Sequence, residues 1–165
     1  MKRSLPFLLL PLMWVLAGCP VSVDYPLGYQ DKDKIDNALI GTWAAADTSA
    51  EVQEVKISKI DEFTLAVEVT KRGSMYVEET DFFKGWCTTI NNQKFVYFQN
   101  AGDNTQGYYS YNYWFEGKQL MTSDFALKVG GVDAVTSIEA YRQEVKASME
   151  YEDFRGTVFA YYKTR

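Results

Sequence analysis

Side chains able to carry out catalysis are scarce in this sequence of 165 residues. It contains no histidine, which excludes Ser-His and Cys-His nucleophilic sites and histidine-based metal sites. The acidic runs at 78–81 and 150–153 divide between the two faces of a strand or follow a helix as solvated charge. The loop at 100–107 lacks the ligand spacing of a calcium loop. We therefore expect no catalytic residue, no metal site and no cofactor, and we do not expect an enzyme.

The densest chemical feature is the aromatic run at 108–115. In a strand, Tyr109, Tyr111, Tyr113 and Phe115 share one face. Tyrosine combines an apolar ring with a hydroxyl, which suits a site for an amphipathic molecule or a sugar. The same face suits cross-strand packing in the wall of a barrel. The sequence leaves both interpretations open, a ligand-binding face and ordinary packing.

Cys87 is one of only two cysteines and lies in a run typical of a strand, residues 85–89. No histidine and no evident cationic partner is available to lower the pKa of its thiol. We expect Cys87 to be a small buried hydrophobic residue. A reactive or intermolecular thiol is the alternative.

The other cysteine, Cys19, ends an export-type segment. Lys2 and Arg3 precede an apolar run of about twelve residues, which is too short to span a bilayer core of ~30 Å. The run ends in Leu16-Ala17-Gly18-Cys19, which resembles the lipobox of bacterial lipoproteins. The resemblance implies a signal peptide at 1–18, cleavage before Cys19 and fatty acylation of that cysteine, for example with palmitate. The alternative is an ordinary secretory peptide or an uncleaved anchor, with Cys19 incidental.

The lipoprotein resemblance implies a place in the bacterial cell envelope. Two or three acyl chains, each contributing ~0.8 kcal/mol per buried CH₂, anchor a protein stably on a membrane. Pro20 occupies the position at which Asp retains such proteins in the inner membrane, which favours the outer membrane, facing the periplasm. Loss of Lys2 and Arg3 with the leader lowers the formal charge from −5 to −7. A chain so acidic repels phosphate backbones, so we expect no nucleic-acid partner.

Residues 19–38 show no sustained hydrophobic period and include Pro20, Pro26 and Gly28. We expect them to form a lipidated N-terminus and flexible tether, roughly 20–25 Å from end to end. The alternative is that part of the segment packs on the domain, held by Tyr25 and Tyr29. The domain itself is expected at 39–165.

Hydrophobic alternation predicts a mainly β domain, most clearly at 63–71, where Phe63, Leu65 and Val67 point one way. Further strands are expected at 41–46, 52–60, 75–80, 82–90, 94–99, 108–116, 120–125 and 157–162, with tight turns at 61–62, 91–92 and 117–118. Eight to nine short strands favour an antiparallel up-and-down barrel or a strongly curved sheet. Closure of the sheet also removes exposed edges.

One helix is expected before the last strand, at about 137–148. Thr136 and Glu139 have the spacing of a capping box. An apolar stripe follows at helical spacing, with the charged residues on the solvent side: the stripe is Ile138, Tyr141, Val145 and Met149, and the charged residues are Arg142, Glu144 and Lys146.

The start of the first strand, Gly41-Thr42-Trp43, resembles the Gly-x-Trp start of lipocalin-type barrels and of small bacterial lipoproteins with lipocalin-like domains. In lipocalins this tryptophan closes one end of the barrel and stacks with a basic residue of the last strand. The resemblance implies that Gly41, Trp43 and Arg155 form such a barrel end. A plain core aromatic residue is the alternative for Trp43.

Together these features predict a lipid-anchored, non-enzymatic envelope protein that binds a small apolar or amphipathic ligand inside a lipocalin-like barrel. The alternative is a protein-interaction, structural or inhibitor lipoprotein with a filled barrel, which would bind an envelope protein through an exposed aromatic patch at Trp86, Trp114 or Tyr108. The state of the barrel interior distinguishes the two.

Overall fold

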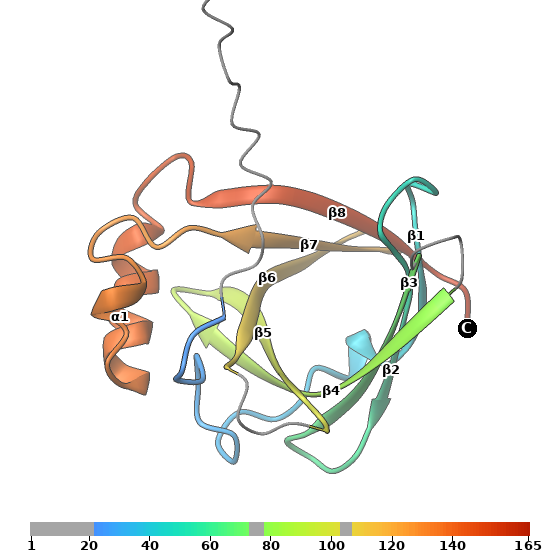
Figure 1. Ribbon diagram of the computed structural model, residues 1–165, viewed down its shortest axis with the longest axis horizontal. Helices are drawn as coiled ribbons and strands as arrows, with labels where there is room; N and C mark the ends of the chain where they lie inside the picture. Colours follow the sequence, from blue (N-terminus) through green and yellow to red (C-terminus); the bar gives the residue numbers. More distant parts are fainter. Residues whose placement is uncertain (1–21, 73–77, 103–106) are drawn as a thin grey trace, which may run out of the picture.

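Eight strands form one closed antiparallel barrel in the computed structural model, which describes residues 22–72, 78–102 and 107–165 (Figure 1). Each strand pairs with the next in the chain, and the last closes on the first. The strands are β1 Gly41–Ala45, β2 Val52–Lys59, β3 Leu65–Arg72, β4 Glu78–Ile90, β5 Gln93–Asn100, β6 Tyr109–Glu116, β7 Gln119–Phe125 and β8 Arg155–Lys163. The predicted lipocalin-like up-and-down barrel is confirmed, and the open curved sheet is excluded.

The barrel has eight strands because the two strands expected at 75–80 and 82–90 are one, β4. Asp81, which we placed between them, pairs with Val69 and forms an ion pair with Lys71. A charged residue with a partner on the neighbouring strand does not end the strand. Residues 75–77 lie outside the described residues.

Two of the three predicted turns, at 91–92 and 117–118, are two-residue hairpin connections, whereas the turn expected at 61–62 lies in the longer connection 60–64. Asn91 and Asn92 have φ values of 48° and 63°, and Gly117 has a φ of 60°. Asparagine and glycine tolerate this left-handed region, so two-residue connections join β4 to β5 and β6 to β7.

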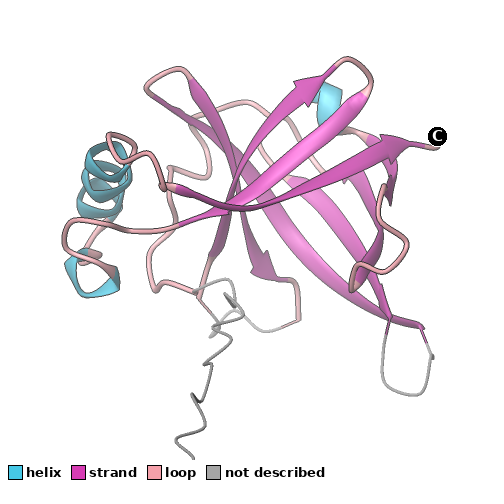
Figure 2. Cartoon of the chain, turned by 90° about the horizontal axis from the view of Figure 1, so that it is seen from above, coloured by secondary structure: helices cyan, strands magenta, loops and turns pink. Residues whose placement is uncertain are grey.

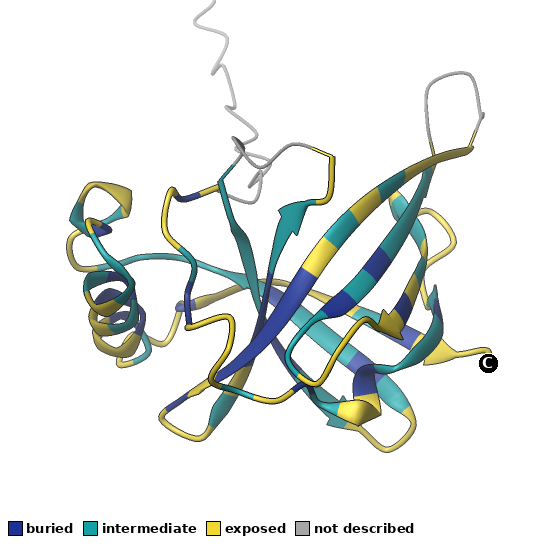
Figure 3. Cartoon of the chain, turned by 90° about the horizontal axis from the view of Figure 1, so that it is seen from below, coloured by how far each residue is buried: buried dark blue, intermediate teal, exposed yellow. Residues whose placement is uncertain are grey.

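The two ends of the barrel differ. At one end, which we call the capped end, lie the short hairpins and the 3₁₀-helix η1 (Asn37–Leu39), whose Leu39 is buried. At the other, the loop end, β1, β3, β5 and β7 end and β2, β4, β6 and β8 begin, and the long connection 126–154 with η3 and α1 lies there. Figure 3 shows buried and exposed positions alternating along several strands, as expected where one face of a sheet meets a core.

Two hydrophobic cores sit on opposite faces of the sheet. The first lies in the barrel interior and includes Trp43, Leu65 and Tyr113. The second lies on the outer face of β4 and β5, where Trp86, Phe95 and Tyr97 point outward. The helix α1 (Ile138–Ser148) and the N-terminal segment cover this second core (Figure 2).

The predicted helix is confirmed, but its N-cap is Ser137 rather than Thr136. The Ser137 hydroxyl accepts a hydrogen bond from the backbone N–H of Ala140 at 3.0 Å. Tyr141 and Val145 are buried, as the apolar stripe predicted. The 3₁₀-helix η3 (Val132–Ala134) precedes α1.

The placement of Glu144 on the solvent side was wrong, because its side chain is buried. Its carboxylate accepts hydrogen bonds from the backbone N–H groups of Val129, Gly130 and Gly131 at 2.9–3.3 Å, and from the Ser148 hydroxyl at 3.3 Å. The loop that leads into η3 therefore turns back over α1 and supplies the donors that a buried carboxylate requires.

The described part of the expected tether, residues 22–38, packs on the barrel. Val23 pairs with Tyr108 through two backbone hydrogen bonds of 3.0 and 2.7 Å, and Leu27 is fully buried. Tyr25 and Tyr29, the expected contacts, are 39% and 37% exposed, but the Tyr29 hydroxyl donates a hydrogen bond to the Glu139 carboxylate of α1. The segment is thus part of the domain, through Tyr29 as expected and through the buried Val23 and Leu27, which we did not name.

Residues 1–21, which contain the expected signal peptide and Cys19, lie outside the described residues. Within residues 22–72, 78–102 and 107–165, no helix is long and apolar enough to cross a membrane.

Candidate functional site

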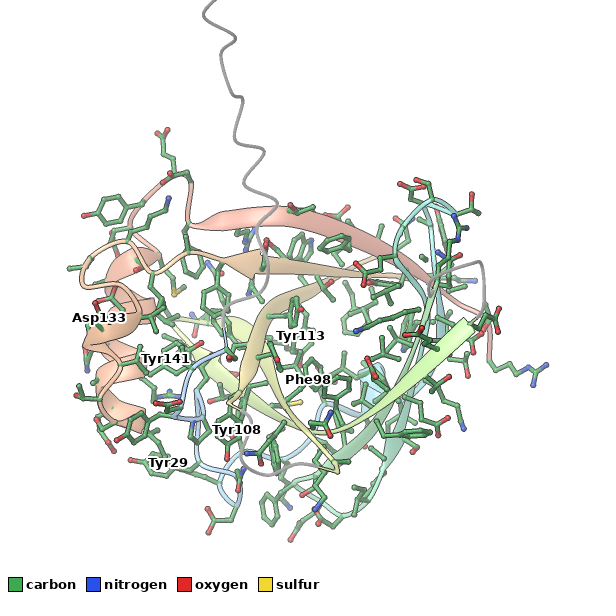
Figure 4. The ribbon with its side chains drawn as sticks, in the orientation of Figure 1. Tyr29, Phe98, Tyr108, Tyr113, Asp133 and Tyr141 are labelled. Carbon is green, nitrogen blue, oxygen red and sulfur yellow. The ribbon has the colours of Figure 1, made fainter. Side chains whose placement is uncertain are left out.

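The four aromatic residues predicted on one face of β6 point into the barrel. Tyr111 is paired with Val96 of β5, and Phe115 with Leu120 of β7, and paired residues of neighbouring strands share a face. Figure 4 shows Tyr113 and Phe98 inside the ring of strands, whereas Tyr141 lies on the helix outside it. Tyr109, Tyr111, Tyr113 and Phe115 therefore line the interior from the loop end to the capped end.

Aromatic rings pack on one another in the half of the interior nearer the capped end. The Trp43 and Phe115 rings lie 6.0 Å apart, those of Tyr113 and Phe115 lie 6.2 Å apart, and both Trp43 and Tyr113 are buried. The Trp43 indole N–H donates to the Leu39 carbonyl at 2.8 Å, which holds η1 across this end. In this half the aromatic residues of β6 serve packing.

Arg155 is not the basic partner of Trp43. It lies on the outer face at the start of β8, with its guanidinium carbon 4.6 Å from the centre of the Trp114 ring. Its Nε donates a hydrogen bond to Asn112 Oδ1 at 2.9 Å. The residue over Trp43 is Lys163, whose Nζ is 5.2 Å from the ring centre. Arg155 begins β8 at the loop end, whereas Trp43 lies near the opposite end, where its strand pairs with Lys163.

Gly41 holds the place at the barrel end that the resemblance implied. Its φ is 145°, and a Cβ there would lie 2.5 Å from Lys163 Cε and 2.6 Å from the Arg165 carbonyl oxygen. Glycine is needed because the backbone is close to the end of the chain in a conformation that other residues rarely adopt.

Solvent reaches the half of the interior nearer the loop end. Tyr109, Tyr111 and Phe83 point inward yet are only partly buried, and Phe159, on the inward side of β8, is 37% exposed. An inward side chain of a closed barrel can meet water only through an end. We call these residues, with Phe98 and Val69, the inner loop-end face.

Polar groups accompany these aromatic rings. Lys71 and Asp81 form an ion pair of 2.8 Å, and Asp124 lies on the inward side of β7. Burial raises the pKa of Tyr111 to about 12, and the charges of Asp124 and Glu51 act in the same direction. Burial likewise raises the pKa of Tyr161 to about 12. Both hydroxyls are therefore protonated donors at neutral pH.

A separate hollow of about 280 Å³ lies at the capped end beside the N-terminal segment. Asp36 there accepts hydrogen bonds from Lys94 at 2.6 Å and from the Tyr113 hydroxyl at 3.2 Å. Partial burial raises the pKa of Asp36, but these bonds and one from the Ala38 N–H outweigh it and hold the pKa below its usual value. The polar groups of Asp36, Lys94 and Tyr113 are thus paired with one another.

Cys87 also borders this hollow, and its side chain is buried, as predicted. Burial raises the pKa of its thiol, so the uncharged form dominates at neutral pH and nucleophilic character is suppressed. The cluster of Asp36, Lys94 and Tyr113 escaped the sequence interpretation because Asp36 was assigned to a tether.

The aromatic patch expected for a protein partner does not form at the residues named. Trp86 is buried and stacks on Tyr97 with ring centres 5.7 Å apart. Tyr108 packs against the same two rings, and Trp114 lies under Arg155.

Comparison with known protein families, curated proteins and solved structures finds no match to this chain. Among the residues that the structure describes, no group of three Cys, Asp or Glu side chains is arranged to hold a metal ion.

Proposed function

We propose that this protein is a lipid-anchored, non-enzymatic component of the bacterial cell envelope that binds a small apolar or amphipathic molecule. The molecule would lie against the inner loop-end face, with Tyr109 and Tyr111 among its contacts. Cys19 would carry the lipid and hold the barrel on the outer membrane, facing the periplasm.

The observation that carries the ligand proposal is the contrast between the two halves of the interior. Trp43 and Tyr113 near the capped end are buried, whereas the aromatic rings of the inner loop-end face, although they pack on one another, keep part of their surface in reach of solvent. Exposed aromatic surface inside a barrel has an unfavourable free energy that a bound apolar molecule would offset.

The position of Val23 supports the proposal that the inner loop-end face lies close to the membrane. Val23 pairs with Tyr108, which directly precedes β6 at the loop end. The chain from Cys19 to Val23 spans four residues and reaches at most about 14 Å. A lipid on Cys19 would therefore hold the loop end beside the bilayer, where apolar molecules collect.

A neutral fluorescent probe, N-phenyl-1-naphthylamine, tests the ligand site. We expect the purified protein to enhance probe fluorescence. The variant Val69→Trp, which places a large ring on the inner loop-end face, should weaken binding at least about tenfold because it occupies the site. Thr70→Trp is the matched control, since Thr70 is the next residue of β3 and points outward. Equal binding by both variants would refute the site.

Metabolic labelling with a palmitate analogue tests the anchor. We expect label in the wild-type protein and none in Cys19→Ser, because that substitution removes the thiol that accepts the diacylglycerol. Equal labelling of both proteins would refute lipidation at Cys19.

The second candidate, a protein-binding lipoprotein, has one observation in its favour. The outer face of β8 exposes Val158 by 47% and Tyr162 by 51%. A photoreactive crosslinker placed at position 162 would capture a stoichiometric protein partner in intact cells. A protein that binds only small molecules has no such partner.

A further inference from the structure

One carboxylate beside the inner loop-end face, that of Asp124, has an oxygen without a partner among the described residues. The Oδ1 atom of Asp124 is buried and accepts no hydrogen bond from any described residue. The side chain packs closely against the backbone of Gly156, which offers no Cβ to displace it. A buried carboxylate oxygen with no donor is energetically unfavourable unless a counter-charge completes its surroundings.

Most of the described charged side chains at this end of the interior are negative. Asp81 is already paired with Lys71, and Glu51 is close enough to influence both Lys71 and Tyr111. The nearby cation Arg72 is directed elsewhere, because its guanidinium donates to the carbonyl of Thr48 at 2.7 Å. Arg155, beside Gly156, lies on the outer face and donates to Asn112. Among the described residues at this end of the interior, the negative Asp124, Asp81 and Glu51 thus outnumber the positive Lys71, which disfavours an anionic ligand such as a fatty acid and favours a cation.

The aromatic rings beside Asp124 suit a cation with organic character. The register of β6 and β7, which pairs Tyr113 with Thr122 and Asn112 with Ser123, places Tyr111 opposite Asp124. The Asp124 charge acts on the Tyr111 hydroxyl, and Tyr109 and Tyr161 are also close enough to affect that hydroxyl. The faces of tyrosine rings attract ammonium groups, most strongly where water is excluded. A divalent metal ion would instead need six or more oxygen ligands, and the described residues do not gather them.

We infer that the ligand is an organic cation, an amine or quaternary ammonium group on a small apolar body, with its charge beside Asp124 and among the tyrosine rings of the inner loop-end face. This inference rests on the proposed function and specifies the chemistry of its ligand.

Three probes of similar size and different charge test the inference: benzyltrimethylammonium, benzyl alcohol and benzoate. Binding to the full chain in detergent micelles is measured by isothermal titration calorimetry, with empty micelles as the blank. We expect the ammonium probe to bind about tenfold more tightly than the neutral probe, and the anion to bind most weakly.

The variant Asp124→Asn should reduce the preference for the cation over the neutral probe at least about fivefold. Asp133→Asn removes an equal charge from an exposed position beside α1 and should leave the preference unchanged (Figure 4). Near-ultraviolet circular dichroism checks that both variants fold. If Asp124→Asn does not fold, the relative affinities of the three probes for the wild-type protein still decide the question.

The outcomes separate this inference from the proposed function. Equal affinity for benzyltrimethylammonium and benzyl alcohol would overturn the cation assignment while leaving a ligand-binding barrel. The same holds if none of the three probes binds while N-phenyl-1-naphthylamine does. If no probe of either set binds, the proposed function fails with it.

Discussion

At the scale of single residues, Glu144 is the buried charge on which the 126–136 loop depends. Burial alone raises its pKa, but hydrogen bonds from Gly130, Val129, Gly131 and Ser148 outweigh that effect and lower the pKa below the ordinary value of 4.5. A carboxylate with a lowered folded-state pKa stabilises the fold above its unfolded pKa. That stability is lost as the pH falls through the folded-state value.

We expect Glu144→Gln to lower the free energy of unfolding by about 1–2 kcal/mol at pH 7, because charge-assisted bonds to the loop are lost. The stability difference from wild type should shrink as the pH falls from 4.5, the unfolded-state pKa, to the lower folded-state pKa of Glu144. Below that folded-state value the wild-type carboxyl is protonated in both states. Urea unfolding of wild type and variant measures the stability difference at pH 7 and again at pH 3. Glu152→Gln, at an exposed position, serves as the control, and a difference that is the same at both pH values would contradict this role.

Gly41→Ala tests the geometry of the barrel end. We expect a loss of about 1–3 kcal/mol, because the new Cβ meets Lys163 and the Arg165 carbonyl and the φ of 145° is strained for alanine. Gly102→Ala, where the nearest atom is 3.5 Å away, should change stability by less than about 0.5 kcal/mol. Thermal unfolding compares the two variants, and equal melting temperatures would show that the close approach at Gly41 does not matter.

The sequence predicted which side chains of β6 share a face but not which basic residue meets Trp43. Alternation is a local property, so Tyr109, Tyr111 and Tyr113 follow from it directly. The contact of Trp43 with Lys163 depends on how β8 closes on β1, across more than a hundred residues. Glu144 was misplaced for a similar reason, since its donors come from a loop that shows no periodic pattern.

At the scale of elements, the N-terminal segment is the main departure from expectation. Its buried residues Val23, Leu27 and Ile35 show no helical or strand period. Val23 and Leu27 join the second core and Ile35 joins the first, and Arg142 of α1 donates to the Leu27 carbonyl at 3.2 Å. Such a segment resembles a tether in sequence because the residues that bury these side chains are distant in the chain.

Leu27→Ala is therefore expected to cost about 2–4 kcal/mol of stability, as for a fully buried leucine in a core. A free tether would tolerate the change. Tyr25→Ala, at a residue 39% exposed in the same segment, should cost less than about 0.5 kcal/mol. Denaturant unfolding followed by circular dichroism provides the comparison, and similar small effects of both changes would mean that the segment does not belong to the folded unit.

At the scale of the whole molecule, the proposed anchor and the barrel axis are linked. Because Val23 is fixed beside Tyr108, a lipid four residues earlier in the chain would place the loop end toward the bilayer and the capped end away from it. This arrangement would let the inner loop-end face receive a ligand from the membrane surface.

Cysteine labelling in outer-membrane fragments, whose periplasmic face is open to the reagent, checks this orientation. A bulky maleimide should label Lys118→Cys, in the β6–β7 hairpin at the capped end, several-fold faster than Asp47→Cys, in the β1–β2 loop at the loop end. A flexible insertion of about twelve residues between Cys19 and Val23 should remove the difference, because it frees the barrel to turn. Equal rates without the insertion would contradict the orientation.

The central claim is that the inner loop-end face holds a small molecule, and native mass spectrometry of the protein isolated from its own cell envelope tests it most directly. We predict a stoichiometric additional mass of small-molecule size on the wild-type protein and on Thr70→Trp, and its absence from Val69→Trp, which fills the site. A wild-type protein that carries no additional mass, or an additional mass that Val69→Trp retains, would contradict the claim.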